Sequence, residues 1–233
     1  MKTNHLFTVN FALVFFTSTN LFAQTETRNV SAFDGIHVAG HYDVTLTKGT
    51  EGTLTLEGDQ EDLDRIKTHV KNGNLVIEQM KTSWLESWNS GQVKIHIPVE
   101  AISKISLSGS GSIYSRNELN SNEFDITLSG SGEIDLNLNA QDINAVLTGS
   151  GDIELRGKTS NVSYQLTGSG DIKSPSLEAL HGHAKVTGSG DIEMYASDSL
   201  NGNVTGSGDI LCHGKPKIQQ IKTTGSGSIE IQD

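Results

Sequence analysis

Five acidic side chains occupy the same place in five successive repeats of this sequence, directly after a Gly-Ser-Gly run. The five are Glu133, Asp152, Asp171, Asp191 and Asp209, and serines hold that place in the first and last repeats (Ser112 and Ser228). Carboxylate oxygens are ligands that Ca²⁺ prefers, so one hypothesis is a line of cation sites. The calcium-binding β-roll, however, has a nine-residue period and a G-G-x-G-x-D signature, which this chain lacks. The simpler alternative is that each acid hydrogen-bonds its own corner and faces solvent.

A second candidate binding site is a pair of tryptophans. Trp84 and Trp88 are four residues apart in the polar stretch KTSWLESWNSG. Exposed indole rings present an apolar face with a polar edge, which suits contact with a sugar or a partner protein. A loop folded back over the end of the core would use the same rings for packing, so both interpretations stay open.

Other reactive side chains offer weaker candidates. His181 and His183 flank Gly182 and would face the same way on a strand, but no third metal ligand lies near them in the sequence. An exposed turn is the simpler interpretation. Cys212, the single cysteine, falls at the inward position that Leu136, Leu155 and Met194 hold in other repeats, which predicts a small core residue. No motif indicates a cofactor or a catalytic nucleophile.

The elements that position these residues are seven repeats, each opened by Gly-Ser-Gly. The successive spacings of the first glycine are 21, 19, 19, 20, 18 and 19 residues, and a fixed period near 20 is typical of a solenoid. Ser or Thr precedes every run, and Ile follows each run by two residues. The corner glycines are Gly109, Gly111, Gly130, Gly132, Gly149, Gly151, Gly168, Gly170, Gly188, Gly190, Gly206, Gly208, Gly225 and Gly227.

Apolar residues alternate with polar ones on both sides of each run, which is the period of a strand. Pairs such as Ala145/Leu147 precede a corner, and pairs such as Ile153/Leu155 follow it. Equivalent strands of successive repeats must then stack in parallel about 4.8 Å apart. The chain is therefore predicted to be all-β, a parallel β-helix with coils of ~19 residues, right-handed by the usual crossover rule. Glycine suits the corner because it reaches positive φ and has no Cβ to meet the neighbouring coil.

Residues 30–107 lack the Gly-Ser-Gly run but keep strand patterning, in FDGIHVAGHYDVTLT, GTLTLEGD, NGNLVIEQM and QVKIHIPVEAI. Leu63, Ile66 and Val70 are at helical spacing, which indicates a short helix or turn within Asp59–Val70. We interpret 30–107 as irregular N-terminal coils with a capping role, and 108–233 as the regular repeats. Because no linker separates them, 24–233 is predicted to be a single domain. The sequence stops almost directly after the strand SIEIQD, so we expect the final coil to be either open or covered by a partner, and an open coil would allow a homo-oligomer.

The first 23 residues resemble a signal peptide, with Lys2, an apolar run from Phe11 to Phe16 and a small residue at Ala23. The run is shorter than the ~20 residues that span a bilayer, so we expect export without a transmembrane anchor, to the periplasm, cell surface or medium. The formal charge is −11, or −12 (−11 − 1) without Lys2. A chain this acidic, without a basic stripe, is not expected to bind nucleic acid.

The motifs together resemble a known family. Phe33-x-x-Ile36-x-Val38-x-Gly40, Asp43-Val44, Leu75-x-Ile77, Pro98 and the recurring L-[ST]-G-S-G-[DSE]-I are similar to the head-GIN-domain family of auto-transporter adhesins, over roughly residues 28–231. The resemblance implies a secreted β-helix of Bacteroidetes-like bacteria with an adhesive role argued from the fold. It implies no catalytic residues.

Three hypotheses for function follow. The favoured one is a noncatalytic interaction protein of the cell envelope, which presents regular faces to a glycan or a protein. The second is a carbohydrate-active enzyme, which would need acids clustered with bases; here Arg156, Lys173 and Lys185 are scattered. The third is a structural envelope protein that stacks end to end.

Overall fold

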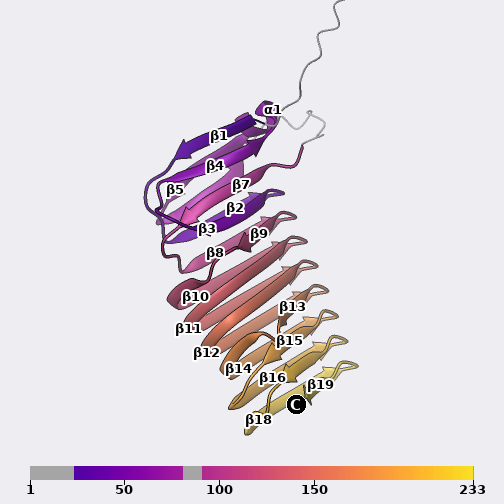
Figure 1. Ribbon diagram of the computed structural model, residues 1–233. Coiled ribbons are helices and arrows are strands. Elements are labelled where there is room, and N and C mark those ends of the chain that lie inside the picture. Colours follow the sequence, from indigo (N-terminus) through magenta and orange to yellow (C-terminus); the bar gives the residue numbers. More distant parts are fainter. Residues whose placement is uncertain (1–23, 81–90, 233) are drawn as a thin grey trace, which may run out of the picture.

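The computed structural model describes residues 24–80 and 91–232, and it confirms the predicted β-solenoid with coils of about 19 residues. Each regular coil has two strands joined by a Gly-Ser-Gly corner, so the molecule consists of two facing layers (Figure 1). Layer A holds the strands that lead into the corners: β2 (Gly35–Gly40), β8 (Lys104–Gly109), β10 (Leu119–Gly130), β14 (Leu177–Gly188), β16 (Ser199–Gly206) and β18 (Ile218–Gly225). It also holds β6 (Asn74–Gln79), which pairs in parallel with β2.

Layer B holds the strands that leave the corners: β3 (Asp43–Lys48), β9 (Ser112–Ser115), β13 (Asp171–Ser174), β15 (Ile192–Tyr195), β17 (Ile210–His213) and β19 (Ile229–Gln232). It also holds β7 (Lys94–Val99), which pairs in parallel with β3. Two long strands, β11 (Glu133–Gly149) and β12 (Asp152–Gly168), begin in layer B and end in layer A. Pairing between successive coils is parallel and in register, so that equivalent residues form straight files along the solenoid.

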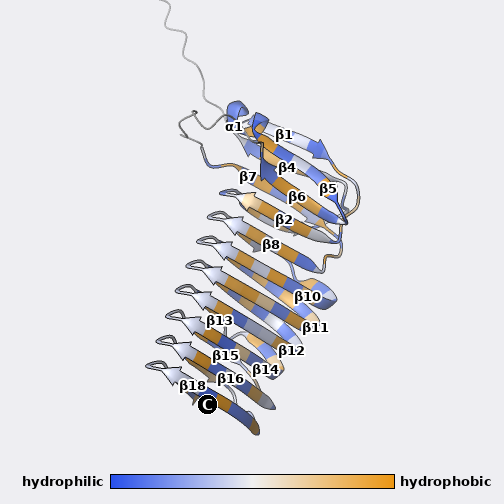
Figure 2. Cartoon of the chain, turned by 180° about the vertical axis from the view of Figure 1, so that it is seen from behind, coloured by the Kyte–Doolittle hydropathy of each residue, from blue (hydrophilic) through white to orange (hydrophobic). Residues whose placement is uncertain are grey.

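The core is the space between the layers, and the period-two pattern fills it. Leu128, Leu147 and Leu166 form one buried file from layer A, and the isoleucines that follow the corners form another from layer B. Figure 2 shows the resulting alternation of apolar and polar residues along the strands. A polar contact lies within the core, where the Tyr164 hydroxyl donates to Ser174 Oγ at 2.8 Å. Cys212 is buried at the expected inward position, opposite Met194.

The two glycines of each corner are needed for different reasons. Gly168 has a φ of +130°, and a Cβ on it would lie 2.1 Å from the carbonyl oxygen of Gly149 in the preceding coil. Gly170 is not among the residues with positive φ, but a Cβ there would lie 2.0 Å from the oxygen of Gly151. The first glycine's carbonyl also holds the next coil: Gly149 O accepts from the N–H groups of Ser169 (2.9 Å) and Gly170 (3.2 Å). Backbone contacts therefore join the corners of successive coils and leave no room for a side chain at either glycine.

The N-terminal coils do not stack in sequence order. The coil of β2 and β3 lies between β6/β7 on one side and β8/β9 on the other. Its corner is Gly40-His41-Tyr42, because Gly40 pairs with Gly109 and its carbonyl accepts the N–H groups of Ser110 and Gly111, both at 3.2 Å. The described residues thus include a further corner, which the Gly-Ser-Gly pattern did not reveal.

The N-terminal end is closed by antiparallel strands and one short helix. β1 (Gln24–Asn29) pairs with β4 (Thr53–Gly58), β4 with β7, and β5 (Ile66–Lys71) with β6. The helix expected within Asp59–Val70 is confirmed only as α1 (Gln60–Asp64), and placing Ile66 and Val70 on it was wrong. They lie on β5 because Asn72 and Gly73, both at positive φ, form the two-residue turn of a β5–β6 hairpin.

No helix in the described part of the chain is long and apolar enough to cross a bilayer.

Candidate functional site

The acids that follow the corners form one straight file on the outer surface of layer B. The register pairs Glu133 with Asp152 and Asp152 with Asp171, and hydrogen bonds link Asp171, Asp191 and Asp209 in turn. We call this set the acid file. The solenoid positions these side chains at the first residue of a layer B strand or directly before it, where the pleat directs them away from the core.

A further acid lies in the line of the acid file two coils before Glu133, with Ser112 in the coil between them. Asp43 is the register partner of Ser112, and its Oδ1 accepts a hydrogen bond from Ser112 Oγ at 2.6 Å. The sequence does carry a signal for it, because Gly40-His41-Tyr42-Asp43-Val44 has the spacing of Gly-Ser-Gly-acid-Ile. Two bulky residues in place of Ser and the second Gly concealed it.

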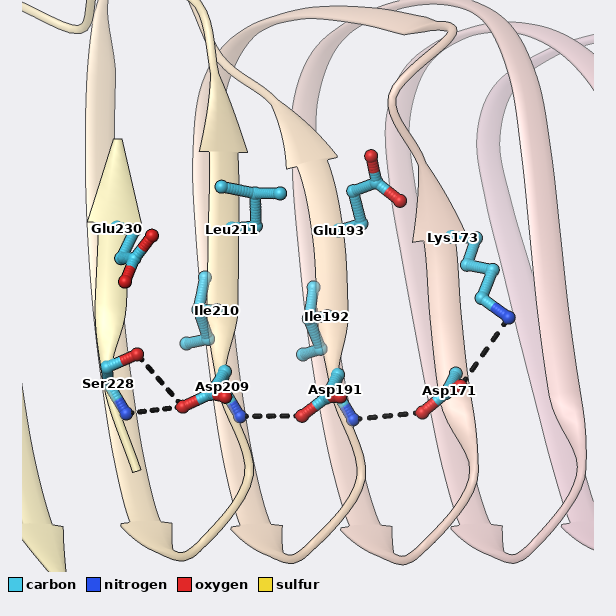
Figure 3. A pocket seen from close by; sticks show the side chains of 10 residues that line it. All are labelled: Asp171, Lys173, Asp191, Ile192, Glu193, Asp209, Ile210, Leu211, Ser228 and Glu230. Carbon is cyan, nitrogen blue, oxygen red and sulfur yellow. Dashed lines mark hydrogen bonds and ion pairs between the residues drawn. The ribbon is translucent and has the colours of Figure 1, made fainter. Parts of the chain in front are cut away.

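The acids at the C-terminal end of the acid file hold the backbone of the next coil. Asp171 Oδ1 accepts from the Asp191 N–H at 3.1 Å, and Asp191 Oδ1 accepts from the Asp209 N–H at 2.8 Å (Figure 3). Asp209 Oδ1 accepts from Ser228 twice, from the N–H at 2.6 Å and from Oγ at 2.9 Å. These hydrogen bonds to a charged acceptor offset the repulsion between stacked carboxylates. They run to the following coil, whereas the sequence predicted hydrogen bonds within each acid's own corner.

The acids at the N-terminal end of the acid file are arranged differently. There the same backbone amides donate to glycine carbonyls: Glu133 N to Gly111 O and Asp152 N to Gly132 O, each at 3.0 Å. The carboxylate of Glu133 instead accepts from the Tyr114 hydroxyl at 2.9 Å. The acid file therefore has two halves, one in which carboxylates face outward and one in which they are part of the backbone hydrogen-bond network.

The second half of the acid file borders a hollow of about 330 Å³. A second outward file forms its other side, in which Lys173, Glu193, Leu211 and Glu230 are register partners in succession. Lys173 Nζ is 3.5 Å from Asp171 Oδ2, and His213 Nε2 is 2.8 Å from Glu193 Oε1. We call this region the layer B hollow; its lining residues are Asp171, Lys173, Asp191, Ile192, Glu193, Asp209, Ile210, Leu211, Ser228 and Glu230. Five carboxylates against one ammonium give it a strongly negative surface.

Further toward the N-terminus, an ion-pair cluster continues the second file. The Arg156 guanidinium is 2.6 Å from Asp135 and 2.8 Å from Glu154, and the hydrogen bond to Asp135 is the main reason that its pKa is raised. One cation thus faces two carboxylates in this cluster, whereas the layer B hollow has five carboxylates and one ammonium.

The other predicted site residues do not join this region. His181 and His183 face outward from layer A, where His181 Nδ1 is 2.9 Å from Ser199 Oγ. Trp84 and Trp88 lie outside the described residues. Within 24–80 and 91–232, no three or more His, Cys, Asp or Glu side chains converge as a metal site would require. Calcium binding by the acid file stays an untested hypothesis.

Comparisons with known proteins agree on the architecture. A family model described as "Putative auto-transporter adhesin, head GIN domain" matches residues 32–216. A crystal structure described as a putative adhesin from Bacteroides fragilis is similar with a TM-score of 0.83 and 25% identity, over 91% of this chain and 98% of that chain. One described as a putative lipid binding protein from Parabacteroides distasonis has a TM-score of 0.74 and 25% identity, over 92% and 98%. No curated protein matches the chain.

Proposed function

The chain belongs to the head-GIN-domain family of auto-transporter adhesins, and we propose that it is a noncatalytic, adhesin-like binding protein of the cell envelope. The observation that carries this proposal is the layer B hollow, an open, negatively charged surface built from side chains in strict register. We propose that it contacts a protein segment or glycan rich in amino or hydroxyl groups, which can donate hydrogen bonds to carboxylates.

The geometry of the acid file supports binding over catalysis. Glycoside hydrolysis needs two carboxylates that flank the scissile bond and act on it as acid and base or nucleophile. Here Asp191 and Asp209 use an oxygen to hold the backbone of the next coil. Glu193 is matched by His213, and Lys173 lies close to Asp171. Each of these groups already has a partner within the fold, which suits a rigid contact surface.

The regular files also suit an extended partner. Register partners repeat at about 4.8 Å, so a ligand lying along the solenoid axis meets equivalent groups at each step. Charge complementarity of this kind raises the rate and the specificity of association more than its strength. Binding is therefore expected to weaken as salt is raised, since exposed charges are screened.

The test is binding of the purified protein to a glycan array and to a panel of lysine-rich peptides. The variant Glu193→Gln/Glu230→Gln removes two charges from the layer B hollow and should lower affinity about tenfold or more, whereas Glu123→Gln/Glu178→Gln removes two exposed charges elsewhere. Equal binding by the two variants would contradict the proposed surface.

The similarity to a protein described as lipid binding supplies a further arm for the same experiment. Phosphatidylcholine vesicles should not be retained, because the apolar side chains of the described residues lie mainly in the core between the layers. Vesicle binding that persists in both double variants would indicate a lipid-directed role in place of the proposed one.

A further inference from the structure

The two ends of the solenoid differ in how they are finished. At the N-terminal end, α1 covers the core and inserts the fully buried Leu63. The Arg28 side chain on β1 fastens this cap, because its guanidinium donates to the carbonyl oxygens of Ile66 (2.6 Å) and Leu63 (2.8 Å). This end offers no open core for another solenoid to stack on.

At the C-terminal end of the described residues, no other described element covers the coil of β18 and β19. Among the described residues, β18 pairs only with β16 and β19 only with β17, so the outer edge of each strand has unpaired backbone groups. Every residue of β18 is exposed. Ile221 lies at an inward position above Gly202 yet is 52% exposed, and Ile229 and Ile231 are only partly buried. The end of the core is therefore an apolar surface between two free strand edges, the arrangement that pairs readily with another strand.

The charges at this end are divided between the two strands. Lys222 points outward from β18, in the same layer A file as Lys185. Glu230 points outward from β19, next to Leu211 in the preceding coil, and lines the layer B hollow together with Asp209. One edge is thus positive and the other is negative on a single molecule. A surface that carries both halves of a complementary pair matches a second copy of itself.

We propose that this end pairs with the same end of a second copy to form a closed, two-fold dimer. Layer A strands run toward the Gly-Ser-Gly corner and layer B strands run away from it, so β18 and β19 point in opposite directions. A half-turn about an axis parallel to the strands exchanges the layers and keeps each strand's direction. Then β18 meets the partner's β19 as an antiparallel neighbour, and Lys222 lies beside the partner's Glu230.

The charges select this arrangement over the other two-fold arrangement. A half-turn about an axis perpendicular to the layers would pair β19 with the partner's β19 and bring like charges together, which is destabilising across strands. The chosen arrangement also covers Ile221 of both copies. Because each interface uses the same end of both copies and the opposite ends are capped, assembly stops at two.

The test is the molar mass of the purified protein, measured by light scattering and sedimentation velocity across micromolar concentrations. We expect twice the mass of the chain. Ile221→Lys should yield a monomer, whereas the control Leu180→Lys, at a position 50% exposed on β14, should stay dimeric. Circular dichroism and thermal melting establish that both variants are folded.

A charge exchange tests the orientation. Lys222→Glu and Glu230→Lys should each weaken the dimer about fivefold or more, and the double variant should restore it, since the pairs are re-formed with reversed sign. Raised salt should reduce the effect of each single change. A wild-type monomer at every concentration, a longer polymer, or a dimer that Ile221→Lys leaves intact would overturn the proposal.

Discussion

The Oδ1 atom of Asp191 accepts a hydrogen bond from the backbone N–H of Asp209 at 2.8 Å, so that a side chain of one coil holds the main chain of the next. The same contact recurs from Asp171 to Asp191 and from Asp209 to Ser228. In the earlier coils a glycine carbonyl oxygen accepts the hydrogen bond from the equivalent backbone amide. The repeated acid thus has a structural role in the last coils beyond the charge that it contributes to the surface.

This contact predicts that Asp191→Ala is destabilising although the residue is exposed. Without the carboxylate, the Asp209 N–H loses its protein acceptor and can hydrogen-bond only to water. The free energy of unfolding should therefore fall by about 1 kcal/mol. Asp152→Ala is the matched control, because the amide of the next coil there, Asp171 N, donates to Gly151 O at 3.2 Å. Urea unfolding of the two variants measures the difference. Equal stabilities would mean that the carboxylate–amide contact contributes nothing.

Calcium should not stabilise the protein beyond an ionic-strength effect. The second-half carboxylates already accept backbone hydrogen bonds, and no metal cluster is found among the described residues. Melting temperatures in calcium chloride and in sodium chloride of matched ionic strength should coincide. A saturable increase with calcium, lost in Asp171→Asn/Asp191→Asn, would instead show specific cation binding by mass action.

The second glycine of a corner should tolerate substitution as poorly as the first, although its φ is not positive. In Gly170→Ala the new Cβ would lie 2.0 Å from Gly151 O, and in Gly168→Val it would lie 2.1 Å from Gly149 O at a φ of +130°. Each variant should lose roughly 2 kcal/mol or more, since backbone must move or strain must be stored. Glu154→Ala, on the outer face of β12, should lose less than about 1 kcal/mol because its ion pair with Arg156 is exposed. Thermal melting compares the three.

The complete burial of the Tyr164 hydroxyl predicts a loss of stability at alkaline pH. Burial raises the pKa of Tyr164 well above its ordinary value of 10.0. The unfolded chain therefore releases this proton at a lower pH than the folded protein. The stabilisation is complete below the ordinary value and is lost as pH rises beyond it. Tyr164→Phe should flatten the decline in melting temperature above pH 10.0, and an unchanged decline would assign it to other groups.

Cys212 should react slowly with a thiol reagent in the native protein. It is fully buried, and desolvation raises the pKa of its thiol, which lowers the fraction of reactive thiolate. Labelling should become fast in urea. Fast labelling of the folded protein would show that layer B opens near β17.

The sequence by itself determined the regular half of this protein. Its Gly-Ser-Gly period and the alternation around it predicted the strands, the corners and the inward file that contains Cys212. These succeeded because each follows from contacts within one coil or between adjacent, identical coils. The Asn72–Gly73 turn was an equally local signal, and the helical spacing of Leu63, Ile66 and Val70 obscured it.

Only the tertiary structure decided how the N-terminal coils are ordered and what the acids contact. The insertion of β2 and β3 between β6/β7 and β8/β9 depends on pairing between strands distant in the chain, and nothing in a strand's own residues marks its neighbours. The two halves of the acid file likewise share one sequence pattern. They differ in whether a carboxylate or a glycine carbonyl accepts the hydrogen bond from the next coil's amide, and this partner is visible only once the coils are stacked.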